Sequence, residues 1–575
     1  MSTNPQKLQL FEVPQIESIQ DMLLKSSAKY SNKLAMEDLQ KYPISSVTYT
    51  ELKDHIFKFG SSLQKLGLKP RDHVAVVGEN RVQWAIAFLT SMMFDFVVVP
   101  VDKNLTHSDI LNIIHESDSI ALIFSGSLTE LVKTKKEALG KIKFYISMDL
   151  EKKENDFYSM TEMMKSESAI APKLPKINFD EVAEIIYTSG SLGRAKGVML
   201  SQKNLAVNLM AMRQMVTIYP EDRFIGVLPI HHTYQCTCGF LCTLYSGASV
   251  HFARSLKTIP EDMASSKPTV LLGAPLLYNK MYNKIMKNVS VKKSTSILFN
   301  AMMNISEVTK SFGWKNSKKI LFGKVHKTLG GSMRLLIAGG AAPDPKVSKF
   351  FRDLGFNIIQ GYGLTETSPI LALNKVENFK DDAAGLPLPG VEININKPDK
   401  NGVGEIYVRG LNVMLGYYKN KAITDDAFDK GWFKTGDLGY FDKDGFLFIC
   451  GRMKNVIIAN NGENVFPEEI EDILDRSQFV LECMVYGEED EKHDERIAAL
   501  VVPDTAGFIE YSSKNNVQIT PELINRLISE AIKETNKQLV PFKQIKKFYI
   551  HENELEKTTT QKVKRHMVST ILTQN

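Results

Sequence analysis

Short β-branched segments recur along most of this 575-residue chain, and patterns typical of helices separate them. Several of these segments end in Gly or Pro immediately before the next helical pattern begins. The alternation predicts an α/β architecture with buried sheets, in which binding loops follow the carboxyl ends of the strands. The clearest predicted strands cover residues 73–78, 97–101, 121–126, 182–190, 269–275 and 335–340.

The pattern changes near residue 385, where the predicted strands become short and the turns between them are rich in Gly, Asn and Asp. We therefore expect a small antiparallel or barrel subdomain at about 383–450. A compact α+β segment follows, with predicted helices at about 467–476 and 520–537. Because 575 residues are too many for one hydrophobic core, we expect a large N-terminal domain of stacked α/β sheets (1–452) and a small C-terminal domain (453–575).

The overall composition argues against several classes of protein. A formal charge of +5 is small for this length and does not indicate a nucleic-acid-binding protein. Asp95 interrupts the apolar segment Trp84–Val101, which therefore predicts a buried helix and a core strand rather than a membrane span. Three of the five cysteines cluster in CTCGFLC (236–242), and buried thiols are favoured over a metal site because the spacing matches no common zinc pattern. The N-terminus lacks an apolar leader, which favours a cytoplasmic location.

The segment YTSGSLGRAKG (187–197) combines glycines, hydroxyl side chains and cations, which is typical of a phosphate-binding loop. It does not fit the Walker A pattern, because Ala195 stands where the second glycine is required and Lys196 is followed by Gly197 rather than Ser or Thr. The loop lies between two predicted strands, and a helix begins only after Ser201. These features argue against a P-loop ATPase or kinase.

The same segment resembles the phosphate loop of the adenylate-forming superfamily, the AMP-forming acyl-CoA synthetases and their relatives. Here Ser191-Leu192 replaces the usual pair of threonines and Ala195 replaces proline, while the glycines and the lysine are kept. Six further segments resemble family motifs and occur in family order: LPIHH (228–232), IAGGAA (337–342), GYGLTETSP (361–369), GWFKTGDLG (431–439), GRMKNVIIANNGENVFPEEIE (451–471) and KTTTQKVKR (557–565). The chain is identified as a member of this superfamily, most similar to long-chain fatty acid–CoA ligases.

The resemblance implies ATP and Mg²⁺ as cofactors, coenzyme A as co-substrate, and a catalytic set of four residues. Thr365 is expected to contact the α-phosphate and Glu366 to bind Mg²⁺. Lys562 is expected to bridge the acid and the α-phosphate, whereas its neighbours Lys557, Lys564 and Arg565 are expected to be solvated charges. His232 is expected to border the acyl pocket.

The resemblance also implies a nucleotide- and thiol-binding set. The β- and γ-phosphates would be held by the loop residues Thr188, Ser189, Gly190, Ser191, Gly193 and Lys196. The adenine would be held by Gly361, Tyr362 and Gly363, and the ribose by Asp437 and Arg452.

The remaining residues of this set concern the acyl chain and the thiol. Room for the acyl chain would be left by the small residues Gly339, Gly340 and Ala341. Lys454 would serve as the hinge of a mobile C-terminal domain, and Gly462 would admit the pantetheine arm.

The implied activity is ATP-dependent conversion of a fatty acid to its acyl-CoA through an acyl-adenylate, with release of AMP and pyrophosphate. One alternative is an acyl-ACP synthetase, or another carboxylate-adenylating enzyme that loads a carrier protein. A second is a non-catalytic nucleotide-binding scaffold, which the presence of Lys562, Glu366 and Asp437 disfavours. Chain length, acceptor and oligomeric state stay open.

One surface feature bears on partners. Residues 280–327 contain eleven lysines and a single acid, Glu307, together with several apolar side chains. The segment is either a solvated helical lobe or a surface that meets anionic lipid headgroups or an acidic partner. The second interpretation predicts peripheral membrane association.

Overall fold

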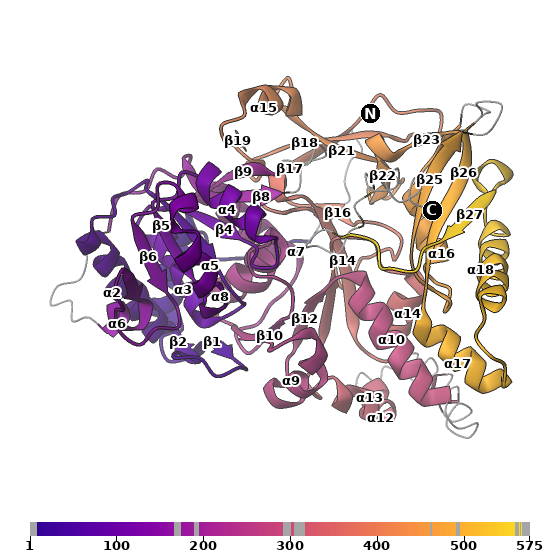
Figure 1. The fold of residues 1–575 in the computed structure, drawn as a ribbon, viewed down its shortest axis with the longest axis horizontal. Coiled ribbons are helices and arrows are strands. Elements are labelled where there is room, and N and C mark those ends of the chain that lie inside the picture. The colour runs from indigo at the N-terminus through magenta and orange to yellow at the C-terminus, as the bar shows by residue number, and fades with distance from the viewer. Residues whose placement is uncertain are drawn as a thin grey trace. The chain divides into compact units, whose positions relative to one another are not determined.

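The computed structural model describes residues 9–165, 174–188, 195–290, 299, 301–303, 317–459, 463–489, 495–557, 563 and 565, and the following concerns these residues (Figure 1). The chain divides into two compact units. The first comprises Met1–Ile393, Val408–Phe433 and Lys443–Leu447, and the second comprises Asn394–Tyr407, Lys434–Asp442 and Phe448–Asn575. Each unit is described by itself.

The first unit contains an eight-stranded sheet in the order β19-β9-β8-β4-β3-β5-β6-β7. The strands from β8 to β7 are parallel, whereas β9 and β19 run antiparallel at one edge. Their bounds are β3 (His73–Val77), β4 (Val97–Val101), β5 (Ala121–Phe124), β6 (Phe144–Ser147), β7 (Phe157–Ser159), β8 (Val182–Thr188), β9 (Lys196–Ser201) and β19 (Gly416–Tyr417).

A second, nine-stranded sheet in this unit has the order β16-β15-β14-β13-β12-β10-β11-β1-β2. Its centre, from β14 to β1, is parallel, and both edges are antiparallel. The bounds are β1 (Leu34–Asp38), β2 (Ser46–Thr48), β10 (Arg223–Gly226), β11 (Ser249–Phe252), β12 (Val270–Gly273), β13 (Leu335–Ala338), β14 (Asn357–Gly363), β15 (Ile370–Leu373) and β16 (Leu386–Pro387).

Two helices lie between these sheets. All twelve residues of α3 (Val82–Met93) are buried, because the helix contacts β1 of one sheet and β3 and β4 of the other. Helix α7 (Gln202–Met215) likewise contacts β8 and β9 on one side and β15 on the other. The stacked sheets confirm the predicted α/β class, and α3 followed by β4 confirms the interpretation of residues 84–101 as a buried helix and a core strand.

The other helices of the first unit flank or extend these layers (Figure 1). Side chains of α4 and α5 join the core of the eight-stranded sheet, and those of α10 and α14 join the core of the nine-stranded sheet. The described part of the chain contains no helix with both the length and the apolar character needed to cross a membrane. The helices are α1 (Ile19–Lys29), α2 (Tyr49–Leu66), α4 (His107–Glu116), α5 (Thr129–Thr134), α6 (Met160–Lys165), α8 (Cys242–Tyr245), α9 (Ile259–Ser266), α10 (Pro275–Ser290), α12 (Ser317–Leu321), α13 (Gly323–Thr328), α14 (Pro345–Asp353) and α15 (Lys421–Ala427).

The β-rich region expected at about 383–450 is a five-stranded sheet built from β17 (Val391–Asn396), β18 (Gly404–Gly410), β20 (Phe428–Asp429), β21 (Trp432–Phe441) and β22 (Leu447–Arg452). The C-terminal part of the second unit is α+β, as predicted. It contains a strand pair, a three-stranded sheet and three helices around one apolar core. These are β23 (Ile457–Ile458), β24 (Asn464–Val465), β25 (Val480–Glu489), β26 (Glu495–Pro503), β27 (Lys547–Ile550), α16 (Pro467–Leu474), α17 (Thr505–Asn515) and α18 (Pro521–Asn536).

Candidate active site

The predicted phosphate loop joins two antiparallel strands. Thr188 at the end of β8 pairs with Lys196 at the start of β9, and the Thr188 hydroxyl donates to the Lys196 carbonyl at 3.5 Å. Helix α7 begins only after Ser201, whose hydroxyl accepts from the N–H of Asn204 at 3.1 Å. The strand–loop–strand arrangement is therefore the predicted one. Four residues of the loop, Ser189, Gly190, Ser191 and Gly193, lie outside the described residues, so their phosphate contacts stay predictions.

A tight turn follows β14 and carries the predicted metal ligand. The strand ends at Gly363, where a Cβ atom would lie 1.9 Å from the carbonyl oxygen of Pro369, so only glycine fits. The N–H of Leu364 donates to the Thr367 hydroxyl at 3.0 Å and closes the turn. Thr365 is buried and Glu366 is half-buried on this signature turn (residues 364–369).

The signature turn is held by a segment that the sequence analysis did not single out. In this brace segment (residues 412–417), the carbonyl oxygen of Asn412 accepts from the Ser368 hydroxyl at 2.8 Å, and the Asn412 amide donates to the carbonyl of Thr367 at 2.9 Å. The N–H of Met414 donates to the carbonyl of Glu366 at 2.8 Å. The Leu415 N–H donates to the Met199 carbonyl on β9 at 2.9 Å, so one segment joins the turn to the phosphate-loop hairpin.

The side chain of Tyr417 brings two predicted site residues together. Its hydroxyl donates to Glu366 Oε1 at 3.0 Å. The Lys196 Nζ lies 5.2 Å from the centroid of the same ring, within the range of a cation–π interaction. The predicted metal ligand and the predicted phosphate-binding lysine therefore share one aromatic neighbour. In the sequence, Tyr417 is marked only by its place in the GYY run at 416–418.

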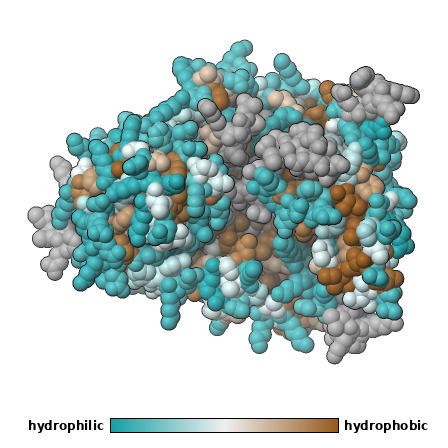
Figure 2. Space-filling view, in the orientation of Figure 1, coloured by the Kyte–Doolittle hydropathy of each residue, from teal (hydrophilic) through white to brown (hydrophobic). Residues whose placement is uncertain are grey.

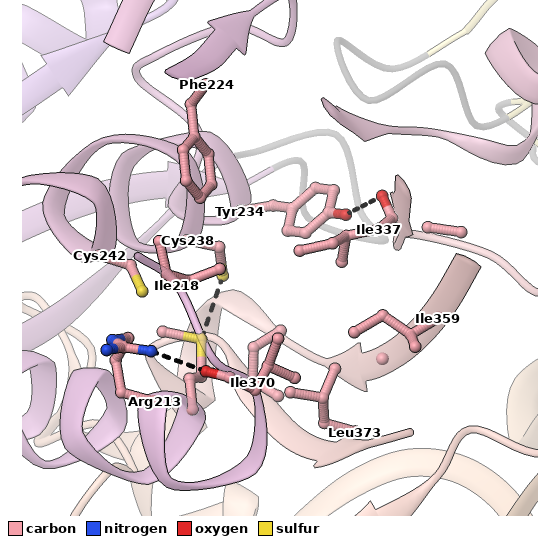
Figure 3. A pocket seen from close by; sticks show the side chains of 14 residues that line it. Arg213, Ile218, Phe224, Tyr234, Cys238, Cys242, Ile337, Ile359, Ile370 and Leu373 are labelled. Carbon is pink, nitrogen blue, oxygen red and sulfur yellow. Dashed lines mark hydrogen bonds between the residues drawn. The ribbon is translucent and has the colours of Figure 1, made fainter. Parts of the chain in front are cut away.

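An apolar cavity with a volume of about 40 Å³ is lined by residues from both strands that flank the signature turn, β14 and β15 (Figure 3). Gly361 on β14, two residues before the end of the strand, forms part of its wall. Tyr234, Ile337 and Ile359 lie on one side in this view, and Arg213 and Cys242 lie on the other. Its walls come from α7 and the π-helical segment η3 (Tyr234–Leu241), from α8, and from strands β10, β13, β14 and β15.

The ring of Tyr234 occupies the space that Gly339 provides. A Cβ atom at position 339 would lie 2.6 Å from Cζ of this ring, and the Tyr234 hydroxyl donates to the Ile337 carbonyl at 3.0 Å. His232 does not line this cavity, but its Nδ1 accepts from the Tyr234 N–H at 3.2 Å. The predicted role of His232 at the acyl pocket therefore stays a prediction.

Three predicted glycine-motif and base-binding residues are described without a contact that tests their roles. Gly340 has a φ of 88° and no heavy atom within 4 Å of a built Cβ atom, which suits it to a turn. Ala341 follows as an exposed residue. Tyr362 is half-buried on β14, and its expected stacking on adenine stays a prediction.

The two residues predicted to bind ribose lie together in the second unit. Asp437 is buried on β21, and the Arg452 Nε lies 2.7 Å from its Oδ1. An Nη1 hydrogen of Arg452 is also donated to the Thr435 carbonyl at 3.1 Å, which fixes the guanidinium. Lys454 follows in a short 3₁₀ turn and is exposed, whereas Gly462 lies outside the described residues.

The C-terminal lysine motif is anchored at both ends. Lys562 itself and Lys564 lie outside the described residues. Lys557 Nζ lies 2.7 Å from a carboxylate oxygen of Glu482, and Arg565 donates to the Val485 carbonyl at 2.8 Å and pairs with Glu471. The prediction that Lys557 and Arg565 are solvated charges was wrong, because each satisfies a largely buried carboxylate.

Comparison with protein families gives two matches. The family described as AMP-binding enzyme matches residues 23–418, and the AMP-binding enzyme C-terminal domain matches residues 469–562. The chain belongs to the AMP-binding enzyme family.

Named relatives of this AMP-binding enzyme cover nearly its whole length. The chloroplastic long-chain-fatty-acid–[acyl-carrier-protein] ligase AEE15 of Arabidopsis thaliana is 26% identical, over 96% of this chain and 85% of its own. The long-chain-fatty-acid–CoA ligase FadD15 of Mycobacterium bovis is 28% identical, over 91% and 90%. Among solved structures, ATP-bound MatB from Rhodopseudomonas palustris is 25% identical, covers 96% of this chain and 98% of its own, and superposes with a TM-score of 0.74.

The donor set of this AMP-binding enzyme fits Mg²⁺ bound together with a nucleotide. Mg²⁺ is usually held by one or two carboxylates, with substrate phosphates and water completing its shell. Glu366 would supply such a carboxylate, and its Oε1 accepts a hydrogen bond from the Tyr417 hydroxyl. Within the described ranges, no cluster of three or more His, Cys, Asp or Glu side chains forms a separate metal cage.

The cysteine cluster contributes to the cavity wall. Cys236, Cys238 and Cys242 are buried thiols without disulfides, and two of them, Cys238 and Cys242, line the cavity. Burial raises the pKa of the Cys242 thiol to about 11, so the group is neutral at physiological pH. Cys238 Sγ lies 3.5 Å from Met212 Sδ. These contacts agree with the interpretation of the cluster as small buried thiols.

Proposed function

We propose that this AMP-binding enzyme activates a fatty acid with ATP, forms an acyl-adenylate and transfers the acyl group to coenzyme A, with release of pyrophosphate and AMP. One observation carries the proposal: the apolar cavity reaches Gly361 on β14, the strand that leads into the signature turn with Thr365 and Glu366. A carboxylate at the mouth of this cavity would face the turn, while its hydrocarbon chain entered the apolar interior. The relatives named long-chain-fatty-acid ligases support this substrate class.

The chemistry requires positive charge near two anions. A carboxylate is a poor electrophile, and adenylation supplies AMP as a leaving group, but the acid must first approach the polyphosphate. Glu366 would hold Mg²⁺, which neutralises phosphate charge when bound. Lys196 would bind phosphate, and Asp437 with Arg452 would hold the ribose. Lys562 would bring its ammonium between the acid and the α-phosphate.

We also propose that the substrate has a long acyl chain, and such a chain requires the cavity walls to move. One water needs roughly 10–15 Å³ of such volume, so the observed cavity of about 40 Å³ accommodates only a few atoms. The walls contain the Met212 side chain, which is unbranched and flexible enough to rotate away. We expect the acyl chain to displace this side chain as it enters.

The test is acid-dependent ATP–pyrophosphate exchange across a series of fatty acids of increasing length. We expect exchange with fatty acids, and a loss of about 10²-fold or more in a Lys562→Ala variant because its ammonium acts in the transition state. Lys514→Ala, an exposed lysine of α17, is the matched control and should retain wild-type exchange. Undiminished exchange in Lys562→Ala would show that this lysine has been misassigned.

An acyl carrier protein is the second candidate acceptor, because the relative AEE15 is named as a ligase for that acceptor. The first half-reaction is identical for both acceptors. Product formation from a pre-formed acyl-adenylate should therefore be compared with coenzyme A and with holo acyl carrier protein. We expect coenzyme A to react faster, and a preference for the carrier protein would favour the alternative.

We also propose the predicted domain division, with a large domain (1–452) and a mobile C-terminal domain (453–575) that turns about Lys454 between the two half-reactions. Proline at this position would restrict the backbone rotation that the turn requires. Lys454→Pro should lower thioester formation while leaving pyrophosphate exchange nearly unchanged. Equal losses in both reactions would contradict a hinge at this residue. Lys454→Ala, which removes the side chain but leaves the backbone free to rotate, is the matched control and should retain thioester formation.

Peripheral membrane contact through residues 280–327 is a further part of the proposal. Lys319, Lys324 and Lys327 are exposed on α12 and α13, and the exposed Ile320 lies among them. The surface over α9, α12 and α13 is largely hydrophilic in Figure 2, which suits headgroup contact rather than deep insertion. The protein should co-sediment with anionic vesicles more than with neutral ones, and Lys319→Glu with Lys324→Glu should weaken this. Equal binding to both vesicles would contradict the proposal.

A further inference from the structure

Tyr417 is held so firmly that its side chain has little freedom. Its backbone pairs with Val198 on β9, and its N–H donates to the Thr424 hydroxyl at 2.8 Å. The residue is only 8% exposed. Because both the backbone and the ring are fixed, the hydroxyl position is set by the fold before any ligand binds.

The hydroxyl of Tyr417 determines how the Glu366 carboxylate is oriented. It donates to Oε1 at 3.0 Å, while the Met414 N–H fixes the Glu366 backbone carbonyl at 2.8 Å. A hydrogen bond to a charged acceptor is stronger than one between neutral groups. One carboxylate oxygen is thereby directed toward Tyr417, which sets the direction of the other.

The ring of Tyr417 acts on a second charged group. The Lys196 ammonium lies 5.2 Å from the ring centroid, a distance at which the ring quadrupole attracts a cation. Lys196 closes the phosphate-loop hairpin, whereas Glu366 belongs to the signature turn. One side chain therefore contacts both a cation and an anion, which belong to two separate motifs.

We propose that Tyr417 is a positioning residue for magnesium-bound ATP, acting through Glu366 and Lys196. It presets the orientation of the metal-binding carboxylate and keeps the phosphate-binding ammonium beside it, so that neither has to be ordered when the nucleotide arrives. The inference rests on the proposed function only in so far as the site binds Mg²⁺ and ATP. The acid and the thiol acceptor do not enter it.

The first test separates the hydroxyl from the ring. Tyr417→Phe keeps the ring beside Lys196 but loses the hydrogen bond to Glu366, and the Mg²⁺ concentration for half-maximal ATP binding should rise by about tenfold. Tyr417→Leu also removes the aromatic face, and the apparent Kd for ATP at saturating Mg²⁺ should rise further. Binding is measured by titration calorimetry without acid or thiol.

Tyr418→Phe is the matched control. The Tyr418 hydroxyl donates to Asp118 Oδ2 at 2.8 Å, so this variant also loses one tyrosine–carboxylate bond, at the neighbouring residue. Its thermal stability should change as much as that of Tyr417→Phe, but its Mg²⁺ dependence should stay at the wild-type value. The same Mg²⁺ dependence in both variants would overturn the proposal and leave Tyr417 a purely structural residue.

A double substitution tests whether Tyr417 acts through Glu366. In a Glu366→Gln background, Tyr417→Phe should have little further effect on the Mg²⁺ dependence, because the carboxylate it orients is gone. A full additional tenfold loss in that background would contradict the mechanism. Failure of the wild-type protein to bind magnesium-bound ATP would instead contradict the proposed function itself. Failure of the Tyr417 proposal is therefore distinguishable from failure of the proposed function.

Discussion

The two sides of the candidate site are built by different means. The signature turn is fixed by hydrogen bonds from the brace segment, three of them at Thr367, Ser368 and the carbonyl of Glu366. The cavity behind it is shaped almost wholly by the packing of apolar side chains from distant elements. The polar residues of the turn are therefore positioned by directional hydrogen bonds that tolerate little displacement. The apolar wall of the cavity can instead change shape when its side chains move.

Two carboxyl groups of the first unit make the contrast specific. Glu366 is half-buried and accepts a hydrogen bond from Tyr417. Glu184 lies on β8 with 1% of its surface exposed, and its Oε1 has no hydrogen-bond partner among the described residues. Burial raises the pKa of Glu184 to about 8. Glu184 is thus a polar carboxyl group in buried surroundings of the kind that form the cavity.

The largest effect on stability is expected from Glu184→Gln. The folded-state pKa of about 8 lies above the ordinary glutamate value of 4.5, so between these pH values the folded protein keeps a proton that the unfolded chain loses. The wild-type free energy of unfolding should therefore fall as pH rises through this window, by roughly 3–4 kcal/mol in total. Glu184→Gln removes this loss, and thermal unfolding from pH 5 to 8 would measure it.

The control for this prediction is Glu130→Gln, which removes an exposed carboxylate on α5. Its unfolding temperature should follow the wild-type pH profile. If Glu184→Gln also ran parallel to the wild type, Glu184 would have to be ionised in the folded protein, and this prediction would be wrong.

A smaller effect is expected from resizing the cavity. Ile218 lies in the loop after α7 and is part of the cavity wall, so Ile218→Phe should fill space that an acyl chain would use. The ratio of kcat/KM for long acids to that for short acids should fall by about 10–100-fold, since each methylene group in an apolar pocket contributes roughly 1–3 kcal/mol. Ile218→Ala should move the ratio in the opposite direction. Acid-dependent pyrophosphate exchange would measure both.

Ile509→Phe, on the exposed face of α17, is the control for nonspecific effects of a larger side chain. It should leave the chain-length profile unchanged. A chain-length profile that was also unchanged in both Ile218 variants would mean that the acyl chain occupies another part of the molecule. The apolar cavity would then have no role in binding the acid.

The same contrast explains what could be predicted from the sequence. The residues of the signature turn are contiguous, and the contact of Gly363 with Pro369 depends only on local backbone, so the motif identified the turn. Tyr417 and Glu366 are 51 residues apart, and Tyr234 and Ile337 are 103 apart. Arg565 looked solvated because its partner Glu471 lies 94 residues earlier. Such tertiary pairs leave no periodic or local pattern to read.

The smallest effect is expected from Tyr234→Phe, which removes a polar contact from the apolar side. The Ile337 carbonyl accepts from the hydroxyls of both Tyr234 and Tyr278, at 3.0 and 2.8 Å, so it stays bonded when one donor is lost. The free energy of unfolding should fall by less than about 1 kcal/mol, and exchange activity should hardly change because the ring still fills the space beside Gly339. Thermal unfolding and acid-dependent exchange would measure the two effects. A large loss of activity in this variant would mean that the Tyr234 hydroxyl contacts the substrate, and the cavity would then carry directional polar chemistry of the kind found at the turn.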